Sequence, residues 1–376
     1  MTDHYYMKRA IELARKGEGR VNPNPLVGAV VVKNGHVISE GWHHNYGGLH
    51  AEREALRALK EPAQGATIYV TLEPCCHYGK QPPCTAAIIE HGISRVVIGS
   101  RDPNPAVSGK GARMLREHGI IVVENFMREE CDALNPIYFH YITTGRPYVK
   151  MKYAMTADGK IATKTGDSKW ITSAEARDLV HKWRNACMGI MAGIGTVLAD
   201  DPMLNCRVPG GKNPVRIICD SRLRIPEDSQ ICRTAAEHET IVACALPKKS
   251  ECWPEDICRK ADILRRLGVE VWNVPVQDDG VDLWELTMRL GQRGIDSILL
   301  EGGGTLNESA LRAGIVQEIN AFVAPMIFGG RARSPVEGIG IEVPNEALQL
   351  KAEQIKKVGK DLLVTYRTIQ DWKQKR

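Results

Sequence analysis

The sequence lacks any hydrophobic run long enough to cross a membrane. No stretch approaches the about 18 consecutive apolar residues that a spanning helix needs. The first residues, MTDHYYMKRAIELARKGEG, have the pattern of an amphipathic helix, and they contain neither the apolar core nor the cleavage site of a secretory signal. These absences predict a cytoplasmic protein without a membrane segment.

The usual signatures of nucleic-acid binding are also missing. The chain contains no RNA-binding fingerprint and no arginine-rich run, and only 6% of its residues are aromatic. Its net charge of +5 is spread along the sequence, which suits phosphorylated small molecules at least as well as nucleic acid. We therefore expect small-molecule partners and no nucleic acid.

Cysteine is plentiful, but its distribution does not indicate a disulfide framework. The 11 cysteines are an odd number, scattered over 376 residues. This pattern favours reduced thiols and metal ligation over disulfide bonds.

Alternating helical and strand patterns divide the chain into two domains. Residues 26–41 (LVGAVVVKNGHVISEG) predict a hairpin that turns at Asn34-Gly35, because this dipeptide is typical of tight hairpin turns. Gly145 and Pro147 mark a linker, after which the alternation starts again. The sequence thus predicts an α/β protein with domains 1–145 and 146–376. Strands of the second domain are expected at YVKMKYAM, GIMAGI, PVRIICD, TIVACAL, VEVWNVP, SILLEGG and EINAFVAP.

The first domain contains a pattern of candidate zinc ligands. His50 and Glu52 form H-x-E at the start of a predicted helix, and Pro74-Cys75 forms P-C, two elements of a zinc deaminase signature. In that signature the glutamate is a general acid/base and not a ligand. The pattern departs at the second cysteine, because eight residues (76 to 83) separate Cys75 from Cys84 where two are usual. One imidazole and two thiolates would leave a fourth zinc position for water, whose pKa zinc lowers to roughly 7.

The stretch EPCCHYGKQPPC (73–84) offers more donors than such a site needs. Cys75 follows the proline of the signature directly, so it is a better ligand candidate than Cys76, and His77 would line the pocket. Cys84 follows two prolines and opens a predicted helix, whose positive end favours the thiolate. Two alternatives stay open: free buried thiols in a loop, or a closed structural zinc with Cys76 or His77 as fourth ligand.

Four segments of the first domain closely resemble the deaminase half of the bifunctional riboflavin biosynthesis protein family: VNPNPLVGAVVVKNG, GWHHNYGGLHAEREAL, TLEPCCHYGKQPPCTAAIIEHG and SRDPNPAVSGKG. The long spacing before Cys84 is usual in that family, whereas Cys76 stands where a serine is typical. The resemblance implies a zinc-dependent, cytidine-deaminase-like α/β/α sandwich, with zinc on His50, Cys75 and Cys84 and with Glu52 as the catalytic residue. It also implies substrate contacts from Asn22, Asn24, His43, Lys80, Asp102 and Asn104.

Residues 147–368 resemble the reductase half of the same family, which implies a dihydrofolate-reductase-like α/β fold and the cofactor NADPH. No G-x-G-x-x-G follows the first strand, which argues against a standard Rossmann fold. The resemblance implies cofactor contacts from Ala154, Trp170, Thr196, Asp200, Ser221, Gly302, Gly303, Gly304, Thr305, Leu306 and Asn307. It implies substrate contacts from Ser168, Arg184, Leu204, Arg207 and Glu301, with Lys152 and Asp200 as catalytic residues.

Three arginines of the second domain have side chains that suit phosphate groups. Arg184 and Arg207 offer planar, bidentate donors to the substrate phosphate. Arg222, which follows the predicted strand PVRIICD, could favour the 2′-phosphate of NADPH.

The leading interpretation, taken from the resemblance, is an enzyme that deaminates 2,5-diamino-6-ribosylamino-4(3H)-pyrimidinone 5′-phosphate with zinc and then reduces the ribosyl group of the product with NADPH. The resemblance also implies a homo-oligomer. A nucleoside or transfer-RNA deaminase with an accessory domain is one rival, and it predicts a basic groove with aromatic residues. A zinc-stabilised RNA-binding protein is the other rival, and it would not need Glu52.

Overall fold

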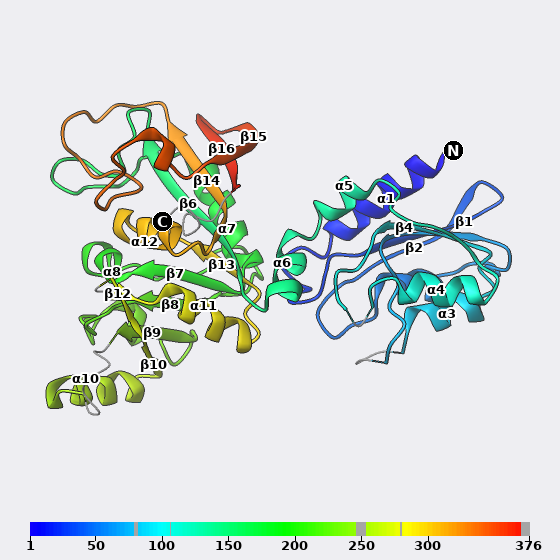
Figure 1. Cartoon of the computed structure of the whole chain (residues 1–376), viewed down its shortest axis with the longest axis horizontal. Helices are drawn as coiled ribbons and strands as arrows, with labels where there is room; N and C mark the ends of the chain where they lie inside the picture. The colour runs from blue at the N-terminus through cyan, green and yellow to red at the C-terminus, as the bar shows by residue number, and fades with distance from the viewer. Residues whose placement is uncertain (79–81, 106, 246–252, 279, 370–376) are drawn as a thin grey trace. The chain divides into compact units, whose positions relative to one another are not determined.

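The computed structural model describes residues 1–78, 82–105, 107–245, 253–278 and 280–369. The chain divides into two compact units, Met1–Gly145 and Arg146–Arg376 (Figure 1). The helices of the first unit are α1 (Asp3–Arg15), α2 (Ala51–Arg57), α3 (Cys84–Glu90), α4 (Lys110–Glu117), α5 (Arg128–Asp132) and α6 (Pro136–Thr144). Its strands are β1 (Gly28–Lys33), β2 (His36–Trp42), β3 (Thr67–Leu72), β4 (Arg95–Ser100) and β5 (Ile121–Val123).

The first unit is built on a five-stranded sheet with the order β2-β1-β3-β4-β5. Strand β1 is antiparallel to β2 and β3, whereas β3, β4 and β5 are parallel to one another. The β1–β2 connection confirms the predicted hairpin, because Asn34 (φ 50°) and Gly35 (φ 78°) both adopt the left-handed conformation that a tight type I′ turn requires.

Helices cover both faces of this sheet. Buried residues of α2, α3 and α4, such as Ala55, Ile88 and Leu115, form one core cluster with the strands. Met7 and Ala10 of α1 belong to a second cluster on the opposite face. The first unit is therefore an α/β/α sandwich, as the sequence predicts.

The second unit is built on a nine-stranded sheet with the order β10-β9-β8-β7-β13-β6-β14-β16-β15. Its strands are β6 (Tyr148–Thr156), β7 (Gly189–Gly193), β8 (Val215–Cys219), β9 (Thr240–Ala245), β10 (Val269–Val274), β13 (Ser297–Leu300), β14 (Val316–Ala324), β15 (Leu350–Val358) and β16 (Asp361–Thr368), with a separate pair β11 (Val276–Gln277) and β12 (Gly280–Val281). Its helices are α7 (Ala174–Ala186), α8 (Ile194–Asp200), α9 (Gln230–Arg233), α10 (Glu255–Arg266), α11 (Leu283–Gln292) and α12 (Gly304–Arg312), with a short 3-10 helix at Pro344–Glu346.

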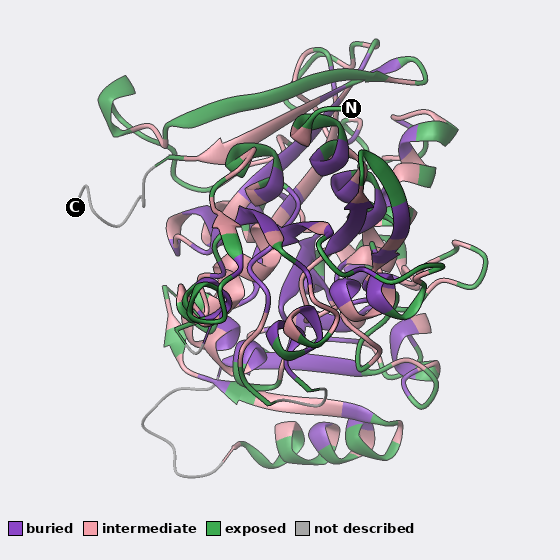
Figure 2. Cartoon of the chain, turned by 90° about the vertical axis from the view of Figure 1, so that its right-hand side faces the viewer, coloured by how far each residue is buried: buried purple, intermediate pink, exposed green. Residues whose placement is uncertain are grey.

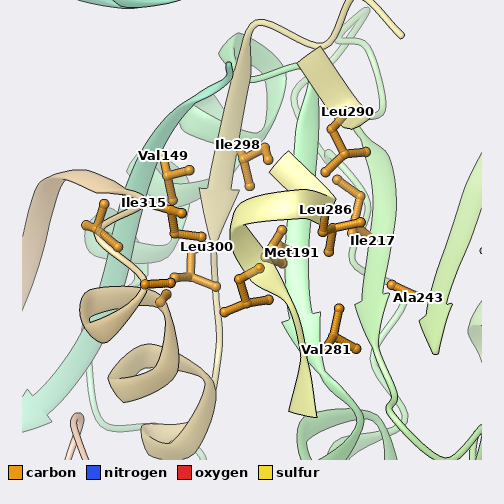
Figure 3. Close-up of a cluster of buried hydrophobic side chains, with 14 of the residues drawn as sticks. Val149, Met191, Ile217, Ala243, Val281, Leu286, Leu290, Ile298, Leu300 and Ile315 are labelled. Atoms are coloured by element: carbon orange, nitrogen blue, oxygen red, sulfur yellow. The ribbon is translucent and has the colours of Figure 1, made fainter. Parts of the chain in front are cut away.

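The large core of the second unit lies between its sheet and the helices α11 and α12. Leu286 and Leu290 of α11 pack over Met191, Ile217 and other strand residues (Figure 3). Helices α7, α9 and α10 bury their apolar sides in two other clusters, which use the alternate residues of the strands. Buried positions accordingly run through the strands and the inward sides of the helices (Figure 2).

Strands β8, β7, β13, β6 and β14 are neighbours and run parallel to one another. The loops after parallel strands meet at one edge of a sheet, where α/β proteins bind ligands. None of the helices in the described part of the chain has the length and apolar character needed to span a membrane.

Candidate active sites

Three candidate metal ligands come together in the first unit. The donor atoms of His50, Cys75 and Cys84 all lie within 4.8 Å of one another. The Nδ1 atom of His50 is 3.6 Å from Sγ of Cys75 and 3.4 Å from Sγ of Cys84. Cys76 and His77 do not belong to this cluster among the residues that the structure describes. One nitrogen and two sulfurs are a donor set that fits zinc with one position left open.

Local backbone structure brings these ligands together. His50 is the N-cap residue of α2, and Cys84 is the first residue of α3. The loop after Cys75 returns so that the Cys84 N–H donates to the Cys75 sulfur at 3.3 Å. Helix α2 lies directly on β2 at Gly41, where a Cβ atom would be 2.3 Å from the Ala55 nitrogen. Glycine at this position therefore allows the helix that begins at His50 to approach the sheet.

The charges around the cluster suit acid–base chemistry. Hydrogen bonds from the Cys84 thiol, His50 and the backbone N–H of Cys84 lower the pKa of Cys75, which favours its thiolate. Glu52 is 3% exposed, and burial raises the pKa of its carboxyl group to about 7. A carboxyl group that titrates near neutral pH can both accept and release a proton during a reaction.

His43 and Asn24 form a hydrogen-bonded pair beside the cluster. The Nδ1 atom of His43 is 2.8 Å from the carbonyl oxygen of Leu49, which can only accept, so Nδ1 carries the hydrogen. Burial lowers the pKa of His43 and favours the neutral ring. Its Nε2 atom then accepts from the Asn24 side-chain amide at 3.0 Å, while the His43 and His50 ring centroids are 5.6 Å apart. Asn22 lies two residues before Asn24 and is half-buried.

The loop after β4 places Asp102 in a buried position. The Tyr138 hydroxyl donates to both of its carboxylate oxygens, at 3.1 and 3.3 Å, and the Asn104 N–H donates at 2.8 Å. Burial raises the pKa of Asp102 to about 6. Lys80, which the resemblance assigns to substrate binding, lies outside the described residues.

Glu73 and Tyr138 are polar residues near this site that sequence reasoning missed. Glu73 is 4% exposed and accepts from the backbone N–H groups of Gly109 (2.9 Å) and Ala112 (3.2 Å) at the start of α4. Its position beside Pro74-Cys75 is a signal that could have drawn attention to it, whereas no sequence pattern connects Tyr138 with Asp102, 36 residues away.

The second unit contains a cavity of about 1010 Å³ at the carboxyl edge of its sheet. It is lined by the predicted residues Lys152, Ala154, Ser168, Trp170, Thr196, Asp200, Ser221, Glu301, Gly302, Gly303, Gly304, Thr305, Leu306 and Asn307. A second hollow of about 680 Å³ shares Lys152, Trp170 and Glu301 with it and adds Arg184 and Arg207. Leu204 lines neither hollow, because its side chain is buried in the core with α8 and α9.

Lys152, Glu301 and Arg184 form a buried ionic cluster, in which Lys152 and Glu301 line both hollows and Arg184 lines the second. The Lys152 ammonium is 3.5 Å from the Glu301 carboxylate, and Arg184 donates to both of its oxygens, at 2.7 and 3.1 Å. Burial raises the pKa of Glu301, but the two cations outweigh it and hold this pKa at about 2. The guanidinium group of Arg184 thus already donates to Glu301. Arg207, which is exposed in the second hollow, is therefore the better phosphate donor of the two predicted arginines.

Asp200 and Trp170 line the cavity without belonging to this ionic cluster. Asp200 is exposed at the end of α8 and has no ion pair with Lys152 among the described residues. Trp170 is 68% exposed, with the Arg177 guanidinium 4.5 Å from its ring centre. The exposure of Trp170 excludes a role as a core aromatic residue.

The glycines after β13 form a cradle at the start of α12. A Cβ atom on Gly304 would lie 2.5 Å from Cγ of Glu337 and 2.7 Å from the Ser334 carbonyl oxygen, so this position admits no side chain. Asn307 is fully buried, and its Oδ1 atom has no hydrogen-bond partner among the described residues. Backbone N–H groups at the N-terminus of α12, which lines the cavity, fit the pyrophosphate of a dinucleotide.

Two sequence families match the chain in the same order as its two units. Residues 1–100 match the cytidine and deoxycytidylate deaminase zinc-binding region, and residues 147–364 match the RibD C-terminal domain. The chain is 52% identical over 367 residues to the riboflavin biosynthesis protein RibD of Actinobacillus pleuropneumoniae, covering 97% of this chain and 95% of that protein. It is 42% identical over 365 residues to RibD of Bacillus amyloliquefaciens, covering 96% and 95%.

Solved structures are similar over the same length. The deaminase/reductase of Thermotoga maritima, named for diaminohydroxyphosphoribosylaminopyrimidine and 5-amino-6-(5-phosphoribosylamino)uracil, is 40% identical, with a TM-score of 0.83 and coverage of 97% of this chain and 98% of that chain. One structure of Acinetobacter baumannii RibD has a TM-score of 0.85 at 35% identity, covering 98% and 99% of the two chains.

Proposed function

The chain belongs to the riboflavin biosynthesis protein RibD family, and from this membership we propose which of its residues serve each reaction. It is a bifunctional enzyme, a deaminase and a reductase in one chain. The first reaction is the zinc-dependent hydrolytic deamination of 2,5-diamino-6-ribosylamino-4(3H)-pyrimidinone 5′-phosphate. The second is the NADPH-dependent reduction of 5-amino-6-(5-phosphoribosylamino)uracil to its ribitylamino form.

His50, Cys75 and Cys84 would hold the zinc of the deaminase site. Zinc bound by one imidazole and two thiolates supplies an activated water at neutral pH. Glu52 would serve as the proton carrier between the attacking water, the ring nitrogen and the leaving amine, a role that suits a carboxyl group whose pKa burial raises to about 7. The closeness of the three donor atoms, within 4.8 Å, is the observation that supports this assignment.

The pyrimidine would be held by groups whose hydrogen-bonding state is already fixed. The Asn24 amide nitrogen donates to His43, so its carbonyl oxygen is left to accept from the substrate. Asn22, Lys80, Asp102 and Asn104 would contribute the remaining contacts. Tyr138 keeps Asp102 in place by donating to both of its oxygens.

In the reductase cavity, NADPH supplies the hydride to the sugar C1′ of the ring-opened imine. The pyrophosphate would lie on Gly302 to Asn307 at the start of α12. Glu301 stays ionised at neutral pH, since its pKa is about 2, and therefore serves to hold Lys152 and not to donate a proton. Lys152 and Asp200 are then the candidate acids, while Arg207 and Ser168 would bind the substrate.

A coupled assay of one purified chain tests the division of labour between the two sites. Glu52→Gln should lower ammonia release by about 10²- to 10⁴-fold, while NADPH oxidation on the pre-formed uracil substrate continues. Lys152→Ala should lower NADPH oxidation and leave ammonia release unchanged. Equal loss of both activities in either variant would contradict two separate sites, and ammonia release that survives Glu52→Gln would favour a different deaminase chemistry.

We further infer a homo-oligomeric enzyme of the cytoplasm that acts on phosphorylated small molecules. The ten cysteines of the described residues are all free thiols, which suits a reducing compartment. Sedimentation of the purified chain would test the oligomeric state directly.

A further inference from the structure

We propose that Arg224 binds the 2′-phosphate that distinguishes NADPH from NADH and so sets the cofactor preference of the reductase. This inference rests on the proposed function of the cavity, because it assumes that a nicotinamide dinucleotide binds there. It concerns one end of the cavity, where the loop after β8 contributes Ser221 and Arg224 to the lining.

The order of the strands places this loop at the end of the cavity remote from the ionic cluster. Strands β6, β13, β7 and β8 are consecutive neighbours. Lys152 lies on β6, and the glycine cradle that fits a pyrophosphate follows β13. Strand β8 is three intervals from β6, or about 14 Å at about 4.8 Å per strand. A dinucleotide with its nicotinamide at Lys152 and its pyrophosphate at the cradle would therefore direct its adenosine toward β8.

Arg224 is tethered at one atom and free to donate from the others. Its Nε atom is 3.7 Å from Oδ1 of Asp220, whose carboxyl group is fully buried and does not line the cavity. The Arg224 side chain is 56% exposed, and Asp220 is its only ion-pair partner among the described residues. The terminal guanidinium nitrogens thus remain available, and their planar geometry matches phosphate oxygens.

The other cations of the cavity are engaged or lie elsewhere. Lys152 pairs with Glu301, and Arg177 stacks on Trp170. Arg312 donates to Glu308 at 2.6 Å.

Arg333 is the remaining cation of the cavity that could bind the 2′-phosphate. Its carbonyl oxygen accepts from the N–H of Ile161, in the segment that follows β6. The segment of Arg333 thus lies beside the residues after β6, and the carbonyl oxygen of the next residue, Ser334, lies against the glycine cradle, whereas Arg224 lies in the loop after β8.

Arg222, the residue that the sequence suggests for this role, does not line the cavity. Leu223, between the two arginines, is buried and has a positive φ of 52°, so the chain turns sharply between them. Arg222 and Arg224 are both exposed in one loop, and Arg222 is therefore a matched control of identical chemistry.

Calorimetric titration of the full chain with 2′,5′-ADP and 5′-AMP separates binding of the 2′-phosphate from catalysis. The wild type and Arg222→Ala should bind 2′,5′-ADP more tightly than 5′-AMP. Arg224→Ala should weaken 2′,5′-ADP by about 10- to 100-fold, the range for losing hydrogen bonds between charged groups, and leave 5′-AMP unchanged. Arg224→Lys keeps a cation beside Asp220 but loses the planar fork, so it should fold normally and give an intermediate loss.

The inference is overturned if Arg224→Ala and Arg224→Lys bind 2′,5′-ADP like the wild type, or if Arg222→Ala loses as much. It is also overturned if the wild type binds 5′-AMP as tightly as 2′,5′-ADP, which would favour recognition of a ribose hydroxyl by Asp278, another cavity residue. A wild-type chain that binds neither NADP⁺ nor NAD⁺ would instead refute the proposed reductase function, so the two failures are distinguishable.

Discussion

Replacing Glu301 with glutamine should destabilise the second unit by about 3 kcal/mol at neutral pH. The Glu301, Arg184 and Lys152 side chains are only 10%, 14% and 19% exposed, and removing one partner of a buried ion pair costs about 3–5 kcal/mol. The lowered pKa of Glu301 gives a similar value for this free energy. Lys152 and Arg184 hold the pKa of Glu301 at about 2 instead of its ordinary 4.5, a difference of about 2.5, which corresponds to about 3 kcal/mol.

The same reasoning fixes the sign of the pH dependence. Because the pKa of Glu301 is lower in the folded protein than in the unfolded chain, its stabilising effect is fully present above about pH 4.5. The effect is lost as the pH falls toward 2. The difference in unfolding free energy between the wild type and Glu301→Gln should therefore be constant from pH 7 to about 5 and shrink below that.

Urea unfolding followed by tryptophan fluorescence is a suitable assay, because Trp42 is the only tryptophan of residues 1–145 and the other six lie in the second unit. Glu237→Gln, at an exposed position of the same unit, is the matched control and should change stability by less than about 0.5 kcal/mol. The reasoning fails if Glu301→Gln is as stable as this control, or if its deficit does not change between pH 7 and pH 3.

Two further substitutions test residues that the sequence did not single out. Glu73→Ala would leave the half-buried N–H of Gly109 and the buried N–H of Ala112 without their acceptor. It should therefore destabilise the first unit by about 2–4 kcal/mol, measured by chemical unfolding, with NADPH oxidation unchanged. Full retention of stability would contradict this role. Arg216 is 1% exposed, burial lowers its pKa to about 10, and it donates to the Thr240 hydroxyl at 2.7 and 2.9 Å. Arg216→Met should therefore lower the unfolding free energy of the second unit by at least about 2 kcal/mol, and a melting temperature equal to that of the wild type would refute this.

Local patterns predicted much of the fold. The turn at Asn34-Gly35 and the seven predicted strands of the second unit are present, because these segments have strong local signals. Strands β15 and β16 were not among the predicted strands. Strand β15 is exposed at every residue except its last and lies at the sheet edge, so its sequence, LKAEQIKKV, carries no pattern of alternating burial.

Contacts between distant residues limited the prediction of the sites. The H-x-E and P-C elements point to His50 and Cys75 as candidate ligands from local sequence alone, and their donor atoms lie together in the structure. The pairing of Arg184 with Glu301 spans 117 residues and depends on strand register, which the sequence does not reveal. The choice between Arg222 and Arg224 depends on one left-handed residue, Leu223, for which no side-chain rule predicts a positive φ.

The zinc content of the purified chain tests the central assignment most directly. Elemental analysis of the wild type and of Cys76→Ser should find about one zinc per chain, because Cys76 lies outside the ligand cluster. Cys75→Ser should lose the metal together with ammonia release. Equal zinc loss in the Cys75 and Cys76 variants, or a wild-type chain that releases ammonia without zinc, would contradict the account.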